Sequence, residues 1–397
     1  MNDDQLIAAI KAFEVADDAA RKDPYAVFGP DSNRKRGLFD SRTRRFKAWD
    51  RSGPCLYRGC QEQSIPRSHA VQRAQALDGI AEDQHVLTPA LDREGALRLQ
   101  RVGVRIASTF PGFCTRHELL FAEFEQAGAI STARHLALQM FRTLCREIAR
   151  KRYSIEQGKQ DLKNYRAARD AYYSSAIMTA APGIAVGGTR AEGDEREDCA
   201  VDLLKSEEEV LRMLEEDLYP EFTDYLETGS PEPSATAVRV PLHIPVSLSG
   251  FAVVNYLERD VPHRALCLVG VVPQGDETVL FIGTAKRHEA LLELWTPRLD
   301  HGFGILNAVE SWMLHGSDHW FLKPSIWAAL PPERQAKILE AITATEGNIG
   351  FSSAFSIFDD LRRWLIEEIS RTVADMGEEE RAASLRVLEA ERAKLNR

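Results

Sequence analysis

Two short stretches, CLYRGC at residues 55–60 and FCTRHE at residues 113–118, contain the spacing that decides the fold of this chain. The first carries two cysteines five positions apart, and the second carries a cysteine and a histidine three positions apart. Zinc takes four thiolate or imidazole ligands in a tetrahedron, and two tight turns that supply two ligands each meet that requirement. We therefore expect a structural Zn²⁺ on Cys55, Cys60, Cys114 and His117.

A second interpretation treats the three cysteines as small buried apolar residues and His117 as a helix cap, because free cysteine is often buried for packing alone. The zinc interpretation is favoured because these cysteines lie in a stretch with few apolar residues to bury them. The other cysteines have no partner at ligand spacing, and we expect core or surface positions for them: Cys145, Cys199 and Cys267.

Around these turns, residues 50–125 resemble the HNH, or ββα-metal, endonucleases, whose zinc fold is of the treble-clef type. In that family a hairpin carries a histidine general base preceded by an aspartate, and a helix carries a metal-binding histidine directly after the second zinc turn. The resemblance assigns the general base to His69, the aspartate position to Ser68 and the metal-binding position to Glu118. It implies phosphodiester hydrolysis assisted by a catalytic Mg²⁺ or Mn²⁺.

The chain departs from this family at two points. Ser68 lacks the carboxylate of the family's aspartate, and no asparagine occurs between His69 and Cys114 to match the family's middle asparagine. The alternative is therefore a treble-clef domain that binds its partner without hydrolysing it. In that case His69 is a structural hydrogen-bonding residue.

Charge is distributed unevenly along the chain. The formal net charge is −10, and nucleic acid is expected to repel a protein that is acidic throughout. However, residues 1–170 carry a net charge of +7 and the remaining residues a net charge of −17. The basic half contains the expected zinc ligands, so the charge argument against a nucleic-acid partner does not apply to it.

Arginine and lysine gather beside the first zinc turn and around His69. Neutralising phosphates with such residues is the main source of affinity for DNA and RNA, so we expect a nucleic-acid partner. A solvated basic loop that pairs with the acidic half is the alternative. Residues 142, 146 and 150 also predict a basic face on one helix. The expected phosphate-binding residues are Arg42, Arg44, Arg45, Lys47, Arg67 and Arg73.

The chain divides into four expected segments of an α+β protein. An N-terminal helix occupies 1–30, a zinc-binding HNH-like domain 31–150, and a helical connector with an acidic loop 151–230. An acidic, mixed α+β domain with a C-terminal helix occupies 231–397. In this last segment the apolar period becomes that of strands, as in RALCLVGVVP and ETVLFIGTA, which the turn QGD joins into a hairpin.

The C-terminal domain carries no catalytic motif, so a regulatory or sensing role is expected, with a second copy of the chain or a partner protein as candidates for binding there. The N-terminus is acidic where a signal peptide is basic, and no apolar stretch is long enough for a membrane span. We expect a cytoplasmic protein without a membrane partner.

The leading expectation is a metal-dependent endonuclease with an attached regulatory domain; in a bacterium, such a fusion resembles an effector of defence against phage. The alternative is a non-catalytic zinc module that binds nucleic acid or protein as an adaptor. A third is a ligand pocket in the C-terminal domain. Convergence of Ser68, His69 and Glu118 on one ion would favour the nuclease, whereas a His69 that is bonded to the backbone would favour the adaptor.

Overall fold

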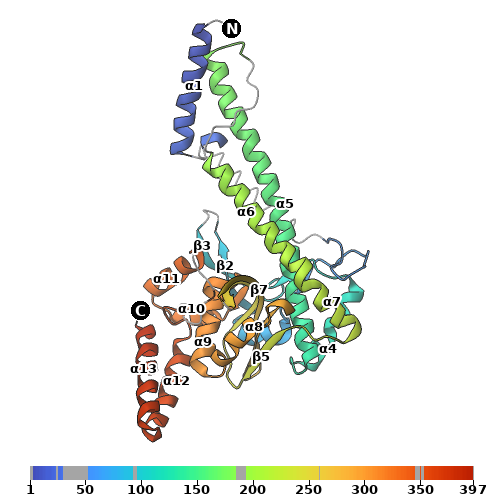
Figure 1. Cartoon of the computed structure of the whole chain (residues 1–397), viewed down its shortest axis with the longest axis vertical. Coiled ribbons are helices and arrows are strands. Elements are labelled where there is room, and N and C mark those ends of the chain that lie inside the picture. Colours follow the sequence, from blue (N-terminus) through green and yellow to red (C-terminus); the bar gives the residue numbers. More distant parts are fainter. Residues whose placement is uncertain are drawn as a thin grey trace. The chain divides into compact units, whose positions relative to one another are not determined.

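The structure is a computed structural model that describes residues 3–23, 26–29, 52–92, 96–184, 194–258, 260–344, 349 and 353–396. The chain forms two compact units (Figure 1). Unit 1 comprises Met1–Arg51 and Arg150–Arg212, and unit 2 comprises Ser52–Ala149 and Met213–Arg397. The long helix α5 (Ala133–Ala180) begins in unit 2 and ends in unit 1.

Unit 1 is helical. It contains α1 (Asp3–Lys22), the short turn η1 (Ala26–Phe28), the second part of α5, and α6 (Glu195–Arg212). The helix α1 has acidic residues in its first turn and basic residues in its last, which suits the helix dipole. It packs its apolar face against the end of α5, where Ala9, Ile177 and Ala181 are buried together.

The helix α6 is held to α5 by ion pairs. Arg169 is buried on α5 and pairs with both Asp194, at 2.8 Å, and Glu197. Burial opposes the charge of Asp194, but the hydrogen bonds from Arg169 leave the pKa of that carboxyl below its usual value. The basic character of α5 and the acidic character of α6 are therefore matched inside this unit.

Unit 2 is built on a seven-stranded sheet in the order β3-β2-β9-β6-β7-β8-β5, with every neighbouring pair antiparallel. The strands are β2 (His85–Leu91), β3 (Leu97–Gly103), β5 (Ala235–Val240), β6 (Val246–Glu258), β7 (Val261–Gln274), β8 (Glu277–Thr284) and β9 (Trp320–Leu322). The expected hairpin turn QGD joins β7 to β8, and its Gly275 adopts a positive φ of 65°.

A second, two-stranded sheet pairs β1 (Ser68–His69) with β4 (Thr109–Phe110). The chain between them makes the turns η2 (Arg73–Leu77) and η3 (Asp78–Ile80) and then the hairpin β2–β3. After β4 come the helical segments α3 (Thr115–Glu118), η4 (Leu119–Phe121) and α4 (Ala122–Ala127). The hairpin β2–β3 is thus an insertion that reaches the large sheet, where Leu87 pairs with Leu322.

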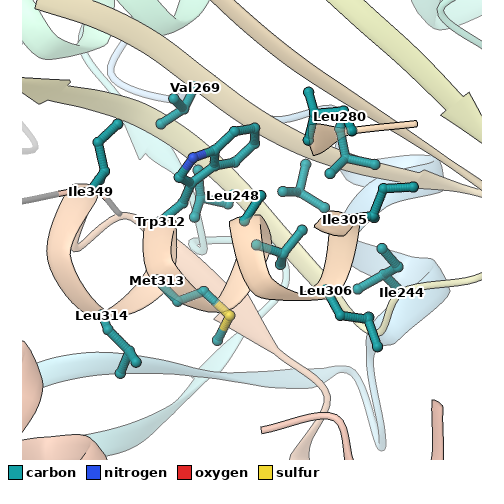
Figure 2. Close-up of a cluster of buried hydrophobic side chains, with 14 of the residues drawn as sticks. Ile244, Leu248, Val269, Leu280, Ile305, Leu306, Trp312, Met313, Leu314 and Ile349 are labelled. Carbon is teal, nitrogen blue, oxygen red and sulfur yellow. The ribbon is translucent and has the colours of Figure 1, made fainter. Parts of the chain in front are cut away.

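The apolar core lies on one face of the large sheet (Figure 2). Leu248, Val269 and Leu280 of the strands pack against Ile305 and Trp312, which lie on α9 (Gly302–Ser311) and η8 (Trp312–Gly316). The opposite face meets the beginning of α5, where the hydroxyl groups of Thr143 and Ser249 are hydrogen-bonded at 2.8 Å. Burying side chains on both faces explains why the strands read as continuous apolar runs.

Helical segments complete unit 2. They are η5 (Met213–Leu218), α7 (Tyr219–Thr228), η6 (Lys286–His288), α8 (Ala290–Trp295), η7 (Thr296–Arg298), α10 (Pro324–Ala329), α11 (Pro332–Thr343), α12 (Asp359–Thr372), η9 (Val373–Asp375) and α13 (Glu378–Leu395). The fully buried Arg362 of α12 pairs with Glu310 of α9 at 2.6 Å and with Glu391 of α13. This network ties the terminal helix to the core.

Several elements differ from the sequence expectations. The helix α5 runs without a break through position 150, so it crosses the boundary expected between the segments 31–150 and 151–230. The sheet joins strands from 85–103 with strands from 235–322, so the segments expected at 31–150 and 231–397 share one unit. The physical reason is the insertion β2–β3, because a single two-stranded hairpin is too small to form a core alone. The class itself, α+β with a Cys₃His cluster, is confirmed.

No helix in the described ranges combines the length and apolar character that crossing a membrane requires.

Candidate metal centre and its hairpin

The four expected zinc ligands come together in the structure. The ligand atoms of Cys55, Cys60, Cys114 and His117 all lie within 4.8 Å of one another. His117 Nδ1 is 3.4 Å from Cys55 Sγ and 3.3 Å from Cys114 Sγ, and Cys60 Sγ is 3.9 Å from Cys114 Sγ. Tetrahedral zinc would separate two sulfurs by about 3.8 Å and a sulfur from a nitrogen by about 3.5 Å. The donor set and its spacing therefore fit zinc.

Local backbone geometry explains how the two pairs form. Gly59 has a φ of 72°, which lets the chain turn back so that the Cys60 amide donates to the Tyr57 carbonyl at 3.1 Å. Cys114 occupies the position before the first turn of α3, which places His117 on the same side of the helix as the sulfur. One ligand therefore precedes the helix and the other lies inside its first turn.

Neighbouring groups favour a thiolate at Cys60. A backbone hydrogen bond at Glu62 lowers the pKa of Cys60, and the Arg116 guanidinium, 3.9 Å from its sulfur, acts in the same direction. Burial raises the pKa of Cys114 to about 11, so metal binding must displace a proton there. Tyr57 stacks on the His117 ring at 4.2 Å between centroids, which fixes the orientation of the imidazole.

His69 lies on β1 of the two-stranded sheet β1–β4, and the chain continues from β4 into α3. Its Nδ1 is 3.1 Å from the Ala107 carbonyl oxygen, and because a carbonyl only accepts, Nδ1 carries the proton and Nε2 presents a lone pair. Burial, followed by the nearby Arg142 cation, lowers the pKa of His69 to about 4. The imidazole is therefore neutral at pH 7, half-buried and bonded to the backbone.

Ser68 is fully buried and does not face a shared site with His69. Alternation along β1 turns the two side chains to opposite faces. The hydroxyl of Ser68 accepts from the Phe113 amide at 3.4 Å, which links the strand to the segment that enters α3. Its role in the structure is to join the hairpin to the second zinc turn.

Glu118 is held in an ion pair through one carboxylate oxygen, while its Oε2 is buried without a hydrogen-bond partner among the described residues. Its carboxylate bonds to Arg142, which is 1% exposed, pairs also with Glu125 at 2.6 Å and lies 4.3 Å over the Phe121 ring. Among the described residues, the Cys₃His cluster is the only group of three or more His, Cys, Asp and Glu side chains spaced to share an ion. The catalytic Mg²⁺ or Mn²⁺ expected from the resemblance therefore has no support in the geometry.

The basic residues divide into three sets. Arg67 and Arg73 are exposed next to the hairpin, Arg73 with a 3.7 Å contact to Asp78. Arg142, expected on an exposed basic face, is instead buried, because its helix is covered by the hairpin and by α4. The other expected phosphate-binding residues lie outside the described ranges: Arg42, Arg44, Arg45 and Lys47.

Sequence reasoning missed two features of this region. Arg105 is exposed in the turn that leads to Ala107, so it lies beside the backbone oxygen that holds His69. The second is Arg142, which forms an ion pair with Glu118 and lowers the pKa of His69. Its position inside an apolar run, LALQMFRTLC, was the available signal, since an arginine among core residues needs a buried acidic partner.

Comparisons of the chain with models of known protein families, with curated proteins and with solved structures gave no match.

Proposed function

We propose that the chain is a zinc-dependent nucleic-acid-binding protein that does not cut its partner. In this proposal zinc on the Cys₃His cluster fixes a strand-strand-helix module of the treble-clef type, formed by β1, β4 and α3. The observation that carries the proposal is that, among the described residues, only the Cys₃His cluster brings three or more ligand side chains together, while Glu118 is paired through Oε1 with buried Arg142.

Zinc would act here as a structural ion. A tetrahedral ion that links Cys55 and Cys60 to Cys114 and His117 would join the segment before β1 to the start of α3. The site leaves no ligand position open for water, since four protein atoms complete the tetrahedron. The ion would therefore hold the two segments together and would not act as a Lewis acid in catalysis.

The nucleic-acid partner is inferred from charge beside the module. Arg67, Arg73 and Arg105 are exposed on the residues that flank β1 and β4. Each can neutralise a phosphate, and each contact releases counterions, which makes such binding sensitive to salt. The basic stretch at 30–51, which lies outside the described residues, adds further positive charge in sequence next to the first zinc turn.

The test is fluorescence anisotropy with the zinc-loaded full chain and labelled DNA and RNA, single-stranded and duplex, at several salt concentrations. Arg67→Gln with Arg73→Gln is expected to weaken binding and to reduce the salt slope by roughly two phosphate contacts. The matched control is Arg363→Gln with Arg371→Gln, which removes two exposed arginines of α12. Equal affinity of both double variants for every nucleic acid would refute the proposal.

A second candidate function, phosphodiester hydrolysis, rests on one observation at His69. Its tautomer leaves Nε2 as a proton acceptor, which is what a general base requires. This candidate predicts that the purified protein nicks DNA with Mg²⁺ or Mn²⁺ and that His69→Ala abolishes nicking while bound zinc stays. Absence of nicking leaves the binding function alone, whereas nicking that survives His69→Ala would refute the role of His69 as the general base.

A further inference from the structure

A cluster of titratable side chains lies outside the zinc module, where the turn η6 contacts the end of β6. The central residue of this cluster is His288 of η6, which is only 8% exposed. The Tyr256 hydroxyl of β6 lies 3.1 Å from His288 Nδ1, and Arg287 Nε donates to His288 Nε2 at 3.2 Å. Both ring nitrogens of this buried histidine therefore have a partner within the protein.

These two contacts determine the protonation state of the ring. A guanidinium only donates hydrogen bonds, so His288 Nε2 accepts from Arg287 and carries no proton. The single proton of the neutral imidazole is then on Nδ1, which donates it to the Tyr256 oxygen. A second proton on Nε2 would set two N–H groups against each other and two positive charges side by side. The contact with Arg287 is therefore compatible only with a neutral His288.

The carboxylates near His288 contact other basic groups. Asp217 of η5 pairs with the Arg287 guanidinium. Glu258 of β6 lies 4.0 Å from Nε2 of His263, a residue of β7 whose ring centroid is 6.3 Å from that of His288. Burial, followed by the charges of Arg287 and His263, outweighs both carboxylates and lowers the pKa of His288 below its ordinary value of 6.5.

The turn η6 has a further attachment, which does not use His288. The Lys286 amide donates to the two carboxylate oxygens of Glu221, on α7, at 2.9 and 3.1 Å. Burial raises the pKa of Glu221, so the folded chain takes up this proton more readily than the unfolded chain does. Titration of Glu221 therefore does not weaken folding as the pH falls, whereas titration of His288 does.

We propose that η6 is an acid-sensitive latch, which holds the end of β6 while His288 is neutral and releases it when His288 binds a proton. The proton comes from water and binds to Nε2, so the hydrogen bond from Arg287 is lost. The charged ring then leaves Tyr256 for water, because a buried charge without a partner is costly. The Lys286–Glu221 hydrogen bonds keep η6 on α7 in the open state, which makes the opening local and reversible.

The size of the effect follows from linkage between proton binding and opening. In the open state His288 is solvated and has its ordinary pKa of 6.5. The equilibrium constant for opening therefore rises as the pH falls below 6.5, and it stops rising once the pH is below the pKa of the closed state. The total rise is tenfold for each unit between these two pKa values. Above pH 6.5 the latch is closed and insensitive to pH.

The experiment uses NMR and hydrogen exchange of the full chain between pH 7 and pH 5. The ring nitrogens of His288 report its tautomer and its pKa. The amides of His288 and Glu289, which donate to the Ala285 and Lys286 carbonyls, report the opening of η6 after correction for the intrinsic exchange rate. The amide of Phe281, in the middle of β8, is the reference for global unfolding. We expect the opening of η6 to increase in acid by the factor that the measured pKa gives.

Three variants separate the latch from general acid destabilisation. Arg287→Gln removes the neighbouring cation, so the pKa of His288 should rise and the acid-induced opening should shrink. Lys286→Gln is the matched control, since its side chain pairs with Glu289 and should leave both quantities unchanged. His288→Gln should abolish the pH dependence of opening.

The wild type and Arg287→Gln decide the question if His288→Gln does not fold. A proton on Nε2 of His288 at pH 7 would overturn the proposal. So would an opening of η6 that does not change with pH, or one that changes equally in the wild type and in Arg287→Gln.

Discussion

At the residue scale, this protein is organised by polar side chains buried beside the hairpin β1–β4. His69 is held neutral between a backbone carbonyl and a buried cation, and Arg142 is compensated by two carboxylates. A buried charge is tolerated only with such partners, since removing one of them leaves an uncompensated charge away from water. The role of each of these residues can therefore be tested by substituting the residue that contacts it.

The pKa of His69 predicts a pH dependence of folding stability. Its folded value of about 4 lies below the ordinary value of 6.5, so the unfolded chain binds a proton between these values and the folded chain does not. Stability from this group is therefore complete above pH 6.5 and falls as the pH falls towards 4, by about 2 kcal/mol for a half-buried group.

The measurement is urea unfolding of the wild type and His69→Gln across this pH range. The difference between the two isolates His69 from carboxylates that titrate in the same window. The wild type is expected to lose stability relative to the variant as the pH is lowered. A constant difference would contradict the assigned pKa.

Replacing Arg142 by methionine predicts two linked effects. The carboxylates of Glu118 and Glu125 lose their shared cation, so the free energy of unfolding should drop by about 3 kcal/mol. The pKa of His69 should rise, because the second cause of its low value is removed. Arg134→Met is the control, since Arg134 lies on the same helix in an exposed pair with Glu123. Chemical denaturation and an NMR titration of the His69 ring measure the two effects.

At the element scale, the strands and the helix beside the Cys₃His cluster are very short, so the proposed zinc ion would add to their stability. The strands β1 and β4 are each only two residues long, and α3 is four residues long. Elements of this size do not hold together through their own hydrogen bonds. Buried Phe110, Phe113 and Phe121 pack these elements together, and zinc on the Cys₃His cluster would add a covalent link between them.

Removal of one zinc ligand tests this dependence. Cys55→Ser should weaken zinc binding by roughly a hundredfold, because one of four ligands supplies a share of a binding free energy of about 10–16 kcal/mol. It should also lower the melting temperature of the first thermal transition. Cys199→Ser is the control, since Cys199 is exposed and outside the cluster. Competition with a chromogenic chelator and calorimetry give the readouts; identical zinc affinity of the two variants would contradict the assignment.

At the scale of the whole molecule, the zinc module and the C-terminal sheet are one folding unit. Leu87 of the inserted hairpin pairs with Leu322, and the Tyr219 hydroxyl donates to the Leu56 carbonyl at 2.6 Å. The Arg239 guanidinium donates to the Ile130 carbonyl at 2.7 Å. These contacts join residues that are far apart in sequence. A fragment that ends between the two residues of a contact therefore lacks one partner of that contact.

A fragment spanning 52–149 is therefore expected not to fold as a whole even with zinc bound. Its β2–β3 hairpin would lose β9, and Val86 would lose the buried contact with Phe321. The fragment should show dispersed NMR signals at most near the zinc ligands and no cooperative thermal transition. A fully dispersed spectrum would mean that the module is an independent domain, as the sequence had suggested.

The elements that the sequence predicted correctly are those whose pattern is local. The spacing of cysteine and histidine predicted the Cys₃His cluster, and the turn QGD predicted the hairpin β7–β8. The apolar runs predicted strands of the core. Each of these signals depends on neighbours within a few residues, where backbone geometry and side-chain period act directly.

The sequence by itself determined the α+β class, the metal ligands and the uneven distribution of charge along the chain. Only the tertiary structure decided that the hairpin β2–β3 joins the C-terminal sheet and that Arg142 is buried and pairs with Glu118. The physical reason is that ligand spacing and periodicity are set by local geometry. Which charges meet, and which strand sides are covered, depends on contacts between residues more than a hundred positions apart, as between β2 and β9.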